Sequence, residues 1–138
     1  MQPNRPKIIF CQRDLAGSPG LVEKAELGGC DVVRTSSLRS AIESAMTGVP
    51  SAIFCETVVD DGTATMLFDM IEKVLPRPNP PIFVMTGATR ELHFAQRRGF
   101  SGVLMSNDST SFERIILQVS ASPFLLPSPF GRKKTSIT

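Results

Sequence analysis

The strongest constraint on the fold of this chain is a set of five short apolar runs that alternate with stretches of helical periodicity. The first run is continuously apolar and rich in β-forming residues. Continuous runs are typical of parallel strands in a sheet that is covered on both faces. The five runs are Lys7–Cys11, Asp31–Arg34, Ala52–Cys55, Pro81–Met85 and Gly102–Met105. Their alternation with helices predicts a single α/β domain.

Capping residues and glycines mark the ends of the first helix. Ser18 followed by Pro19 is typical of a helix start, because serine caps a helix and proline suits its first turn. We expect this helix to run to about Leu27 and to end at Gly28-Gly29.

The second and third helices are predicted from caps and apolar stripes. Ser36 or Ser37 caps the second helix, and Thr63 or Thr65 opens the third. Apolar residues at helical spacing predict the face that each helix buries. These residues are Leu38, Ala41, Ile42, Ala45 and Met46 in the second helix, and Met66, Leu67, Met70, Ile71 and Val74 in the third.

Two more helices and a tail complete the chain. The fourth helix is expected from Thr89 to Gly99, and the fifth starts near Ser109 with the stripe Phe112, Ile115, Ile116 and Val119. From Ser122 onward, prolines and polar residues predict an extended or disordered tail on which Phe124-Leu125-Leu126 is free to dock. We therefore expect a domain over residues 1–121 and a tail over residues 122–138.

These elements predict a doubly wound (βα)5 fold, a flavodoxin-like three-layer sandwich. Right-handed crossovers place the parallel strands in the order 2-1-3-4-5. A functional site in such a sheet lies beyond the carboxyl ends of strands one and three, where the strand order reverses.

Composition argues against several classes of partner. The 138 residues carry a net charge of +2, with 15 basic and 13 acidic residues, which is too balanced to indicate a nucleic-acid partner. No apolar run approaches the ~20 residues of a membrane span, and the N-terminus lacks a signal-peptide pattern. We expect a cytoplasmic protein that binds neither nucleic acid nor membrane, with Arg132-Lys133-Lys134 as a solvated part of the tail.

The cysteines do not form a metal-binding motif. Cys11, Cys30 and Cys55 are far apart in the sequence, and His93 is the one histidine, so we expect no metal and no cofactor. Cys11 and Cys55 are predicted to lie on adjacent strands at the same depth. A redox pair is one interpretation, and two packed core thiols are the favoured one.

The order and spacing of several segments are similar to those of bacterial response-regulator receiver domains. The third run continues to Glu56 and is followed by Asp61-Gly62, and the fourth run ends in Thr86-Gly87. The family pattern Gly-x-x-x-Tyr-Leu-x-Lys-Pro corresponds here to Gly99-Phe100-Ser101-Gly102-Val103-Leu104-Met105-Ser106-Asn107. The resemblance covers residues 7–121.

The resemblance implies a phosphotransfer site whose acidic residues are changed. Family members phosphorylate an aspartate at the end of strand three, with magnesium held by that aspartate and by acids after strand one. Here Glu56 takes the phosphoacceptor position, and Gln12 and Arg13 take the positions of the acids, or Arg13 and Asp14 if the alignment slips by one residue. Because magnesium needs hard oxygen ligands and an arginine repels it, we expect neither magnesium binding nor phosphorylation.

The switch positions implied by the resemblance are also changed. Receivers use a hydroxyl after strand four, an aromatic residue in strand five and a lysine after strand five. Thr86 retains the hydroxyl, whereas Val103 replaces the aromatic residue and Ser106 replaces the lysine. The residues that would follow a bound phosphoryl group are therefore largely absent.

Glu56 and Arg13 each have two interpretations. Glu56 is either a solvated carboxylate at a strand end or a fixed negative charge that stands in for a phosphorylated aspartate. Arg13 either points into water or forms an ion pair with Glu56 across neighbouring strands. We predict the ion pair, because the resemblance to receivers implies that the two positions share one pocket, and their charges are opposite.

The leading hypothesis is a pseudo-receiver, a non-enzymatic signalling or docking module that acts without phosphorylation. The resemblance implies a protein partner, or a second copy of the chain, on the face formed by the fourth helix, the fifth strand and the fifth helix. This face would include Leu92, Phe94, Arg97, Arg98, Phe100, Phe112 and Arg114, some of them core residues.

Two alternatives belong to other classes. One is a conventional receiver of a two-component phosphorelay that uses Asp14 with Asp60 or Asp61, although these two aspartates are more simply turn formers. The other is a small-molecule binder, for which Gly17-Ser18-Pro19-Gly20 is a weak phosphate-loop candidate.

Overall fold

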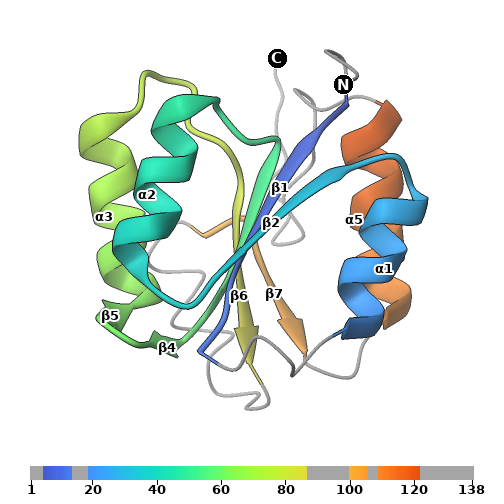
Figure 1. Cartoon of the computed structure of the whole chain (residues 1–138), viewed down its shortest axis with the longest axis horizontal. Helices are drawn as coiled ribbons and strands as arrows, with labels where there is room; N and C mark the ends of the chain where they lie inside the picture. The colour runs from blue at the N-terminus through green and yellow to red at the C-terminus, as the bar shows by residue number, and fades with distance from the viewer. Residues whose placement is uncertain (1–4, 14–18, 87–99, 106–108, 122–138) are drawn as a thin grey trace.

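A five-stranded parallel sheet forms the centre of the molecule (Figure 1). The computed structural model describes residues 5–13, 19–86, 100–105 and 109–121. The strands are β1 (Lys7–Cys11), β2 (Asp31–Thr35), β3 (Ala52–Glu56), β6 (Ile82–Thr86) and β7 (Gly102–Met105). They lie in the order β2-β1-β3-β6-β7, and every neighbouring pair is parallel. The predicted order 2-1-3-4-5 is confirmed, with β6 and β7 as the fourth and fifth strands of the sheet.

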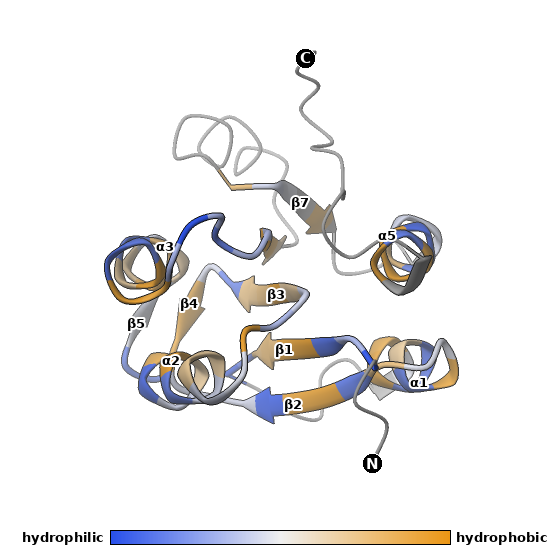
Figure 2. Cartoon of the chain, turned by 90° about the horizontal axis from the view of Figure 1, so that it is seen from above, coloured by the Kyte–Doolittle hydropathy of each residue, from blue (hydrophilic) through white to orange (hydrophobic). Residues whose placement is uncertain are grey.

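Helices cover both faces of the sheet and complete the three layers (Figures 1 and 2). One layer holds α1 (Pro19–Leu27) and α5 (Ser109–Ala121), and the other holds α2 (Leu38–Thr47) and α3 (Ala64–Val74). The predicted fourth helix and the tail from residue 122 lie outside the described residues. None of the helices described is both long and apolar enough to cross a membrane.

The helix ends follow the predicted caps. The side chain of Ser37 accepts a hydrogen bond from the Ser40 N–H at 3.1 Å, and that of Thr63 accepts one from the Met66 N–H at 3.3 Å. Helix α1 ends at Leu27, and Gly29 follows with a φ of 92°, in the left-handed region that glycine adopts without strain.

The sequence did not predict a small antiparallel hairpin between β3 and α3. Its strands β4 (Val58–Val59) and β5 (Gly62–Thr63) are two residues each, and Asp60-Asp61 form the turn, as predicted. Val59 is buried against the core shared by α2 and α3. An added Cβ on Gly62 would lie 2.5 Å from Cδ1 of Leu38, so the glycine lets the hairpin pack closely on α2.

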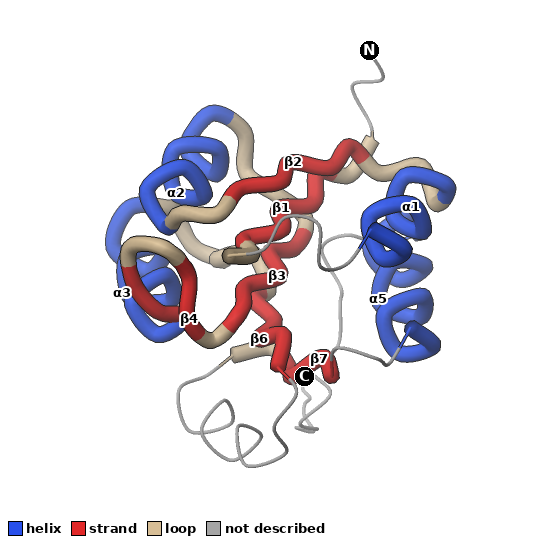
Figure 3. The backbone as a smooth tube through the Cα atoms, turned by 60° about the horizontal axis from the view of Figure 1, so that its bottom comes forward, coloured by secondary structure: helices blue, strands red, loops and turns tan. Residues whose placement is uncertain are grey.

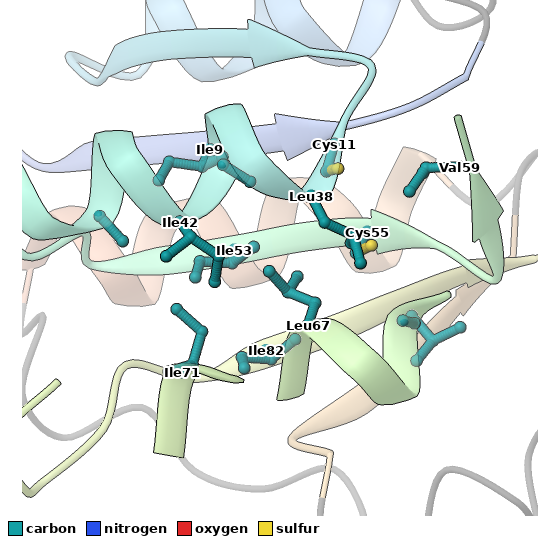
Figure 4. Packing of buried hydrophobic residues seen from close by; sticks show 14 of the residues in the cluster. Ile9, Cys11, Leu38, Ile42, Ile53, Cys55, Val59, Leu67, Ile71 and Ile82 are labelled. Atoms are coloured by element: carbon teal, nitrogen blue, oxygen red, sulfur yellow. The ribbon is translucent and has the colours of Figure 1, made fainter. Parts of the chain in front are cut away.

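Side chains of the central strands alternate between two cores. Figure 4 shows the core on the α2–α3 side, where Ile9 and Ile53 pack with Leu67. On the α1–α5 side the ring of Phe54 stacks between those of Phe10 and Phe83, with centroids 5.2 and 5.1 Å apart. The strand register places these three rings side by side, which fixes the strand ends at one level.

The predicted apolar stripes are wider than the faces that α2 and α3 bury. Helix α3 buries Ala64, Leu67 and Ile71, and α2 buries Leu38, Ala41, Ile42 and Ala45. The remaining predicted stripe residues, Met46, Met66, Met70 and Val74, are exposed. A helix on a flat sheet buries a stripe of about 100°, so these flanking side chains remain outside.

Candidate functional site

The carboxyl ends of β1 and β3 bring the predicted site residues together. Cys11 and Cys55 are direct neighbours in the parallel pair, so the residues after them, Gln12 and Glu56, lie at the same level. The N–H of Gln12 donates to the carbonyl of Thr35 at 2.8 Å, which extends the contact between β1 and β2 by one residue. Both residues therefore stand at the predicted reversal of strand order.

Glu56 contacts the main chain of Arg13 and not its side chain. The N–H of Arg13 donates to Oε1 of Glu56 at 2.6 Å. Within the described residues the ion pairs are Arg5–Asp31, Lys24–Glu113 and Arg39–Glu43, so the predicted Arg13–Glu56 pair is wrong.

Two physical factors explain why Glu56 binds the main chain of Arg13 and not its guanidinium group: the exposure of the Arg13 side chain to water and the fixed position of the N–H. Arg13 is exposed, and an exposed ion pair contributes only about 0–1 kcal/mol, which is a weak force for ordering a long side chain. The N–H beside the strand end is already fixed in place, and a carboxylate binds such a donor strongly. The half-buried carboxylate of Glu56 thus holds the chain just after β1.

Two buried oxygen atoms beside this contact have no hydrogen-bond partner among the described residues. They are Oε1 of Gln12, whose residue is only 2% exposed, and Oγ1 of Thr57. An unpaired buried polar group costs about 1–3 kcal/mol, and ordered water commonly pairs with such groups. Sequence reasoning missed Thr57, whose position directly after Glu56 was its one signal.

The carboxylate of Asp61 is committed to the start of α2. Its Oδ1 accepts from the N–H of Leu38 at 2.6 Å, and its Oδ2 accepts from the N–H of Arg39 at 3.2 Å. The hydrogen bond from Leu38 holds the pKa of Asp61 below its ordinary value. The N–H of Asp60 donates to the carbonyl of Ser36 at 3.1 Å, so the hairpin is fastened to the same helix start.

Cys11 and Cys55 are packed core thiols on one face of the sheet (Figure 4). The hydrogen bond with Cys11, together with burial, raises the pKa of the Cys55 thiol. Thiols with a raised pKa remain protonated and react poorly. The geometry agrees with the favoured interpretation of these cysteines.

The switch positions are described only in their main chain or not at all. Thr86 ends β6 opposite Met105, and Val103 lies in β7 opposite Val84. Asp14 and Ser106 lie outside the described residues. Among the described residues, no group of three or more His, Cys, Asp or Glu side chains is placed to hold a metal ion.

Some residues of the predicted partner face are buried in the hydrophobic core. Phe100 is 2% exposed and packs on Phe68 with ring centroids 5.0 Å apart, and Phe112 is fully buried against Phe10 and Phe54. These two phenylalanines are apolar enough to fill the core and cannot line a surface. Arg114 is exposed, whereas Leu92, Phe94, Arg97 and Arg98 lie outside the described residues.

Solved structures establish the fold more firmly than sequence comparison does. No protein-family model matches the sequence, and no curated protein matches it. The receiver domain (CheY-like) from Methylobacillus flagellatus matches with a TM-score of 0.71 at 17% identity, over 84% of this chain and 98% of that one.

Two further response regulators match in the same way. Chemotaxis response regulator CheY4 of Vibrio cholerae has a TM-score of 0.71 at 14% identity, over 84% of this chain and 98% of its own. A two-component response regulator from Clostridium difficile has a TM-score of 0.70 at 19% identity, over 85% and 96%. The chain therefore has the fold of response-regulator receiver domains. Sequence identities this low support a shared fold and do not by themselves indicate a shared function.

Proposed function

We propose that the chain is a pseudo-receiver, a signalling or docking module that binds a protein partner and needs no phosphorylation. The observation that carries this proposal is the hydrogen bond from the Arg13 N–H to the Glu56 carboxylate. Glu56 stands where a receiver keeps its phosphoacceptor, and this contact occupies one of its oxygens. The proposal includes no catalytic activity for the chain itself.

The residues around Glu56 argue against phosphotransfer. Receiver chemistry needs a magnesium ion between acidic side chains to offset the charge of the incoming phosphoryl group. Gln12 contributes a neutral amide at this edge, and Arg13 brings a positive charge. With Glu56 as the one carboxylate of the three, the charge arrangement for magnesium is missing.

The shifted acidic site of a conventional receiver is also disfavoured. Both carboxylate oxygens of Asp61 accept hydrogen bonds from the first turn of α2. A phosphoryl group on Asp61 would bind one of these oxygens to phosphorus and disturb the cap. The structure therefore favours a structural role for Asp61 over a role as phosphoacceptor.

We infer that the module holds one standing conformation. Phosphorylation switches a receiver because it biases an equilibrium between two states. In this chain the Glu56 contact with Arg13 is already made, so the conformation is set by the sequence. The proposed partner surface is the face of the predicted fourth helix, β7 and α5, where Arg114 is exposed, and a homodimer is one form that this contact would take.

Phosphorylation of the full chain is the direct test. The protein is incubated with acetyl phosphate and millimolar magnesium, and intact mass spectrometry follows the addition of phosphoryl groups. Beryllofluoride, a phosphoryl mimic, is titrated in parallel while amide NMR signals of Arg13, Glu56 and Thr57 are recorded. We expect an unchanged mass and unchanged amide shifts. One added phosphoryl group at Glu56, Asp14, Asp60 or Asp61 would establish a conventional receiver instead.

A further inference from the structure

Helices α2 and α3 share an apolar surface that the core does not use. Met46 of α2 is 60% exposed, and Met66, Met70 and Val74 of α3 are between 39% and 47% exposed. The two helices lie side by side on one face of the sheet (Figures 1 and 3). Methionine is enriched at protein–protein contacts because its flexible thioether adapts to the surface opposite it. These four residues are called the methionine face below.

Packing at the start of both helices places the methionine face between them. A Cβ added to Gly62 would lie 2.5 Å from Cδ1 of Leu38 and 3.0 Å from Sδ of Met66, so the two side chains adjoin the same glycine. Met66 therefore lies on the side of α3 that is next to α2. Met70 and Val74 follow Met66 at intervals of four residues and continue along that side.

Each helix also exposes one acid and one base four residues apart. On α2, Nε of Arg39 lies 3.4 Å from Oε2 of Glu43, and Met46 follows at a spacing that returns to the same side of the helix. On α3, Asp69 and Lys73 are both exposed and border the methionine face. Acid and base are thus separated by about 6 Å along each helix axis.

This order of charges matches a second copy of the chain turned end for end. When two copies of one helix lie antiparallel and a two-fold axis passes midway between acid and base, the acid of each copy is level with the base of the other. Opposite charges then attract at both ends of the contact. Parallel copies in register would place like charges together, so the charges select the antiparallel arrangement.

One two-fold axis serves both helices. Leu38 and Met66 adjoin Gly62, so these two residues lie close to one level. The middle of the α2 charges is Ala41, three positions beyond Leu38, and the middle of the α3 charges is Ile71, five positions beyond Met66. At about 1.5 Å per residue, the two midpoints differ by about 3 Å along the helices. An axis at this level therefore sets α2 against α2 and α3 against α3 of the two copies.

The size of the surface sets the strength of the contact. Helices α2 and α3 have 10 and 11 residues, so each is about 15 Å long, and together they are about 20 Å wide. Their outer surface of about 300 Å² is smaller than the ~800 Å² that each partner contributes to a standard interface. A dimer that uses this surface alone is therefore weak and forms only at high protein concentration.

We propose that two copies of the chain associate through their methionine faces around a two-fold axis, with α2 antiparallel to α2 and α3 antiparallel to α3. The exposed methionines of the two copies leave water together, and each acid lies opposite a base of the other copy. Helix α5 lies in the other helix layer and remains uncovered (Figure 2). The dimer therefore presents two copies of any surface on α5, and the inference does not depend on whether the chain is phosphorylated.

Protein concentration provides the first test. The full chain is followed by sedimentation equilibrium and by NMR of labelled methionine and leucine methyl groups between about 10 µM and about 1 mM. We expect a growing share of dimer at the high end, with shifts of the Met46, Met66 and Met70 signals. Leu27 and Leu117, exposed on the other helix layer, are the control and keep their shifts. A chain that stays monomeric would overturn the proposal and leave the face to a different protein, and a dimer that shifts only the leucine signals would also overturn it.

Matched substitutions separate the methionine face from other exposed apolar positions. Met70→Glu places a charge close to the two-fold axis, and we expect the dissociation constant of the dimer to rise about tenfold or more. Leu117→Glu makes the same change on α5 and should leave the constant within about twofold. Both side chains are exposed, and amide NMR checks that each variant is folded. Equal effects of the two substitutions would contradict the proposed surface.

Charge reversal tests the antiparallel arrangement. Arg39→Glu and Glu43→Arg each leave α2 with two like charges, so each variant alone should dimerise more weakly than the wild type. In an equimolar mixture the two variants carry opposite charges on α2, and we expect them to associate with each other. One variant carries the isotope label, so its methionine signals report the mixed dimer. If mixing does not restore association, the antiparallel contact between identical faces is wrong.

Discussion

The carboxylate of Asp61, in the turn between β4 and β5, caps the main chain of Leu38 at the start of α2 across 2.6 Å. A hairpin that follows β3 thereby holds a helix that follows β2. The contact explains how the connection of seven residues between β3 and α3 is held against the carboxyl edge of the sheet.

Removing this cap is expected to destabilise the fold in a pH-dependent way. Asp61→Ala leaves the N–H groups of Leu38 and Arg39 without their carboxylate, so the melting temperature at pH 7 falls. Asp60→Ala is the matched control, because Asp60 contributes its N–H and not its side chain to the hydrogen bond with Ser36. Thermal unfolding followed by circular dichroism compares the two variants.

The sign of the pH dependence follows from the lowered pKa of Asp61. Its hydrogen bond with Leu38 favours the ionised carboxylate in the folded state. The stabilisation is complete above the unfolded-state pKa of about 3.9 and is lost as the pH falls through the lower folded-state value. The difference between wild type and Asp61→Ala should therefore shrink in acid, and a difference that grows there would contradict the assignment.

Phe100→Ala is expected to lower the free energy of unfolding, because Phe100 is a core residue and does not belong to a docking surface. Phe100 is 2% exposed and packs on Phe68, and loss of a buried phenylalanine costs about 3 kcal/mol or more. Urea denaturation measures the loss. Arg114→Ala, at an exposed position of α5, is the control and should change the free energy of unfolding by less than about 0.5 kcal/mol.

The topology was predictable because strand runs, caps and glycines agree with one another. Continuous apolar runs identify the buried strands, and Ser37, Thr63 and Gly29 mark helix ends where the structure has them. The hairpin was not predictable, because strands of two residues have no periodicity to detect. The apolar stripes predicted for α2 and α3 included residues that are exposed. Helical spacing alone does not distinguish the centre of a buried helix face from its flanks.

The location of the site was predictable from the sequence, but the hydrogen bond that Glu56 forms was not. Strand ends located Gln12, Arg13 and Glu56 at one edge of the sheet, and opposite charges suggested an ion pair. The donor to Glu56 is instead the N–H of Arg13. Every residue other than proline carries such an N–H, so the residue type gives no signal for this contact.

Gln12→Met is expected to leave the stability unchanged or raise it by about 1 kcal/mol. The Oε1 atom of Gln12 is buried without a partner among the described residues, and methionine has nearly the same shape without a polar group to satisfy. Urea denaturation gives the difference in the free energy of unfolding. A loss above about 1 kcal/mol would show that the amide makes a hydrogen bond, such as one to ordered water.

Glu56→Gln tests what the negative charge at the strand end contributes. The amide oxygen of glutamine can still accept from the Arg13 N–H, so the contact of 2.6 Å is retained as a neutral hydrogen bond. A neutral bond is weaker than a charged one, and we expect a loss of about 1 kcal/mol in the free energy of unfolding. Glu43→Gln, which breaks an exposed pair with Arg39 at 3.4 Å, is the control and should cost less.

The same variant separates a charge mimic from a passive surface. One carboxylate supplies fewer contacts than a phosphoaspartate with its metal, so we expect Glu56→Gln to leave the affinity for a partner, or for a second copy, within about twofold, which is below 0.5 kcal/mol. Affinity is measured by titration calorimetry or analytical ultracentrifugation at a pH where the protein is folded. A tenfold loss of binding, with the fold intact by amide NMR, would instead identify Glu56 as a permanent substitute for phosphorylation.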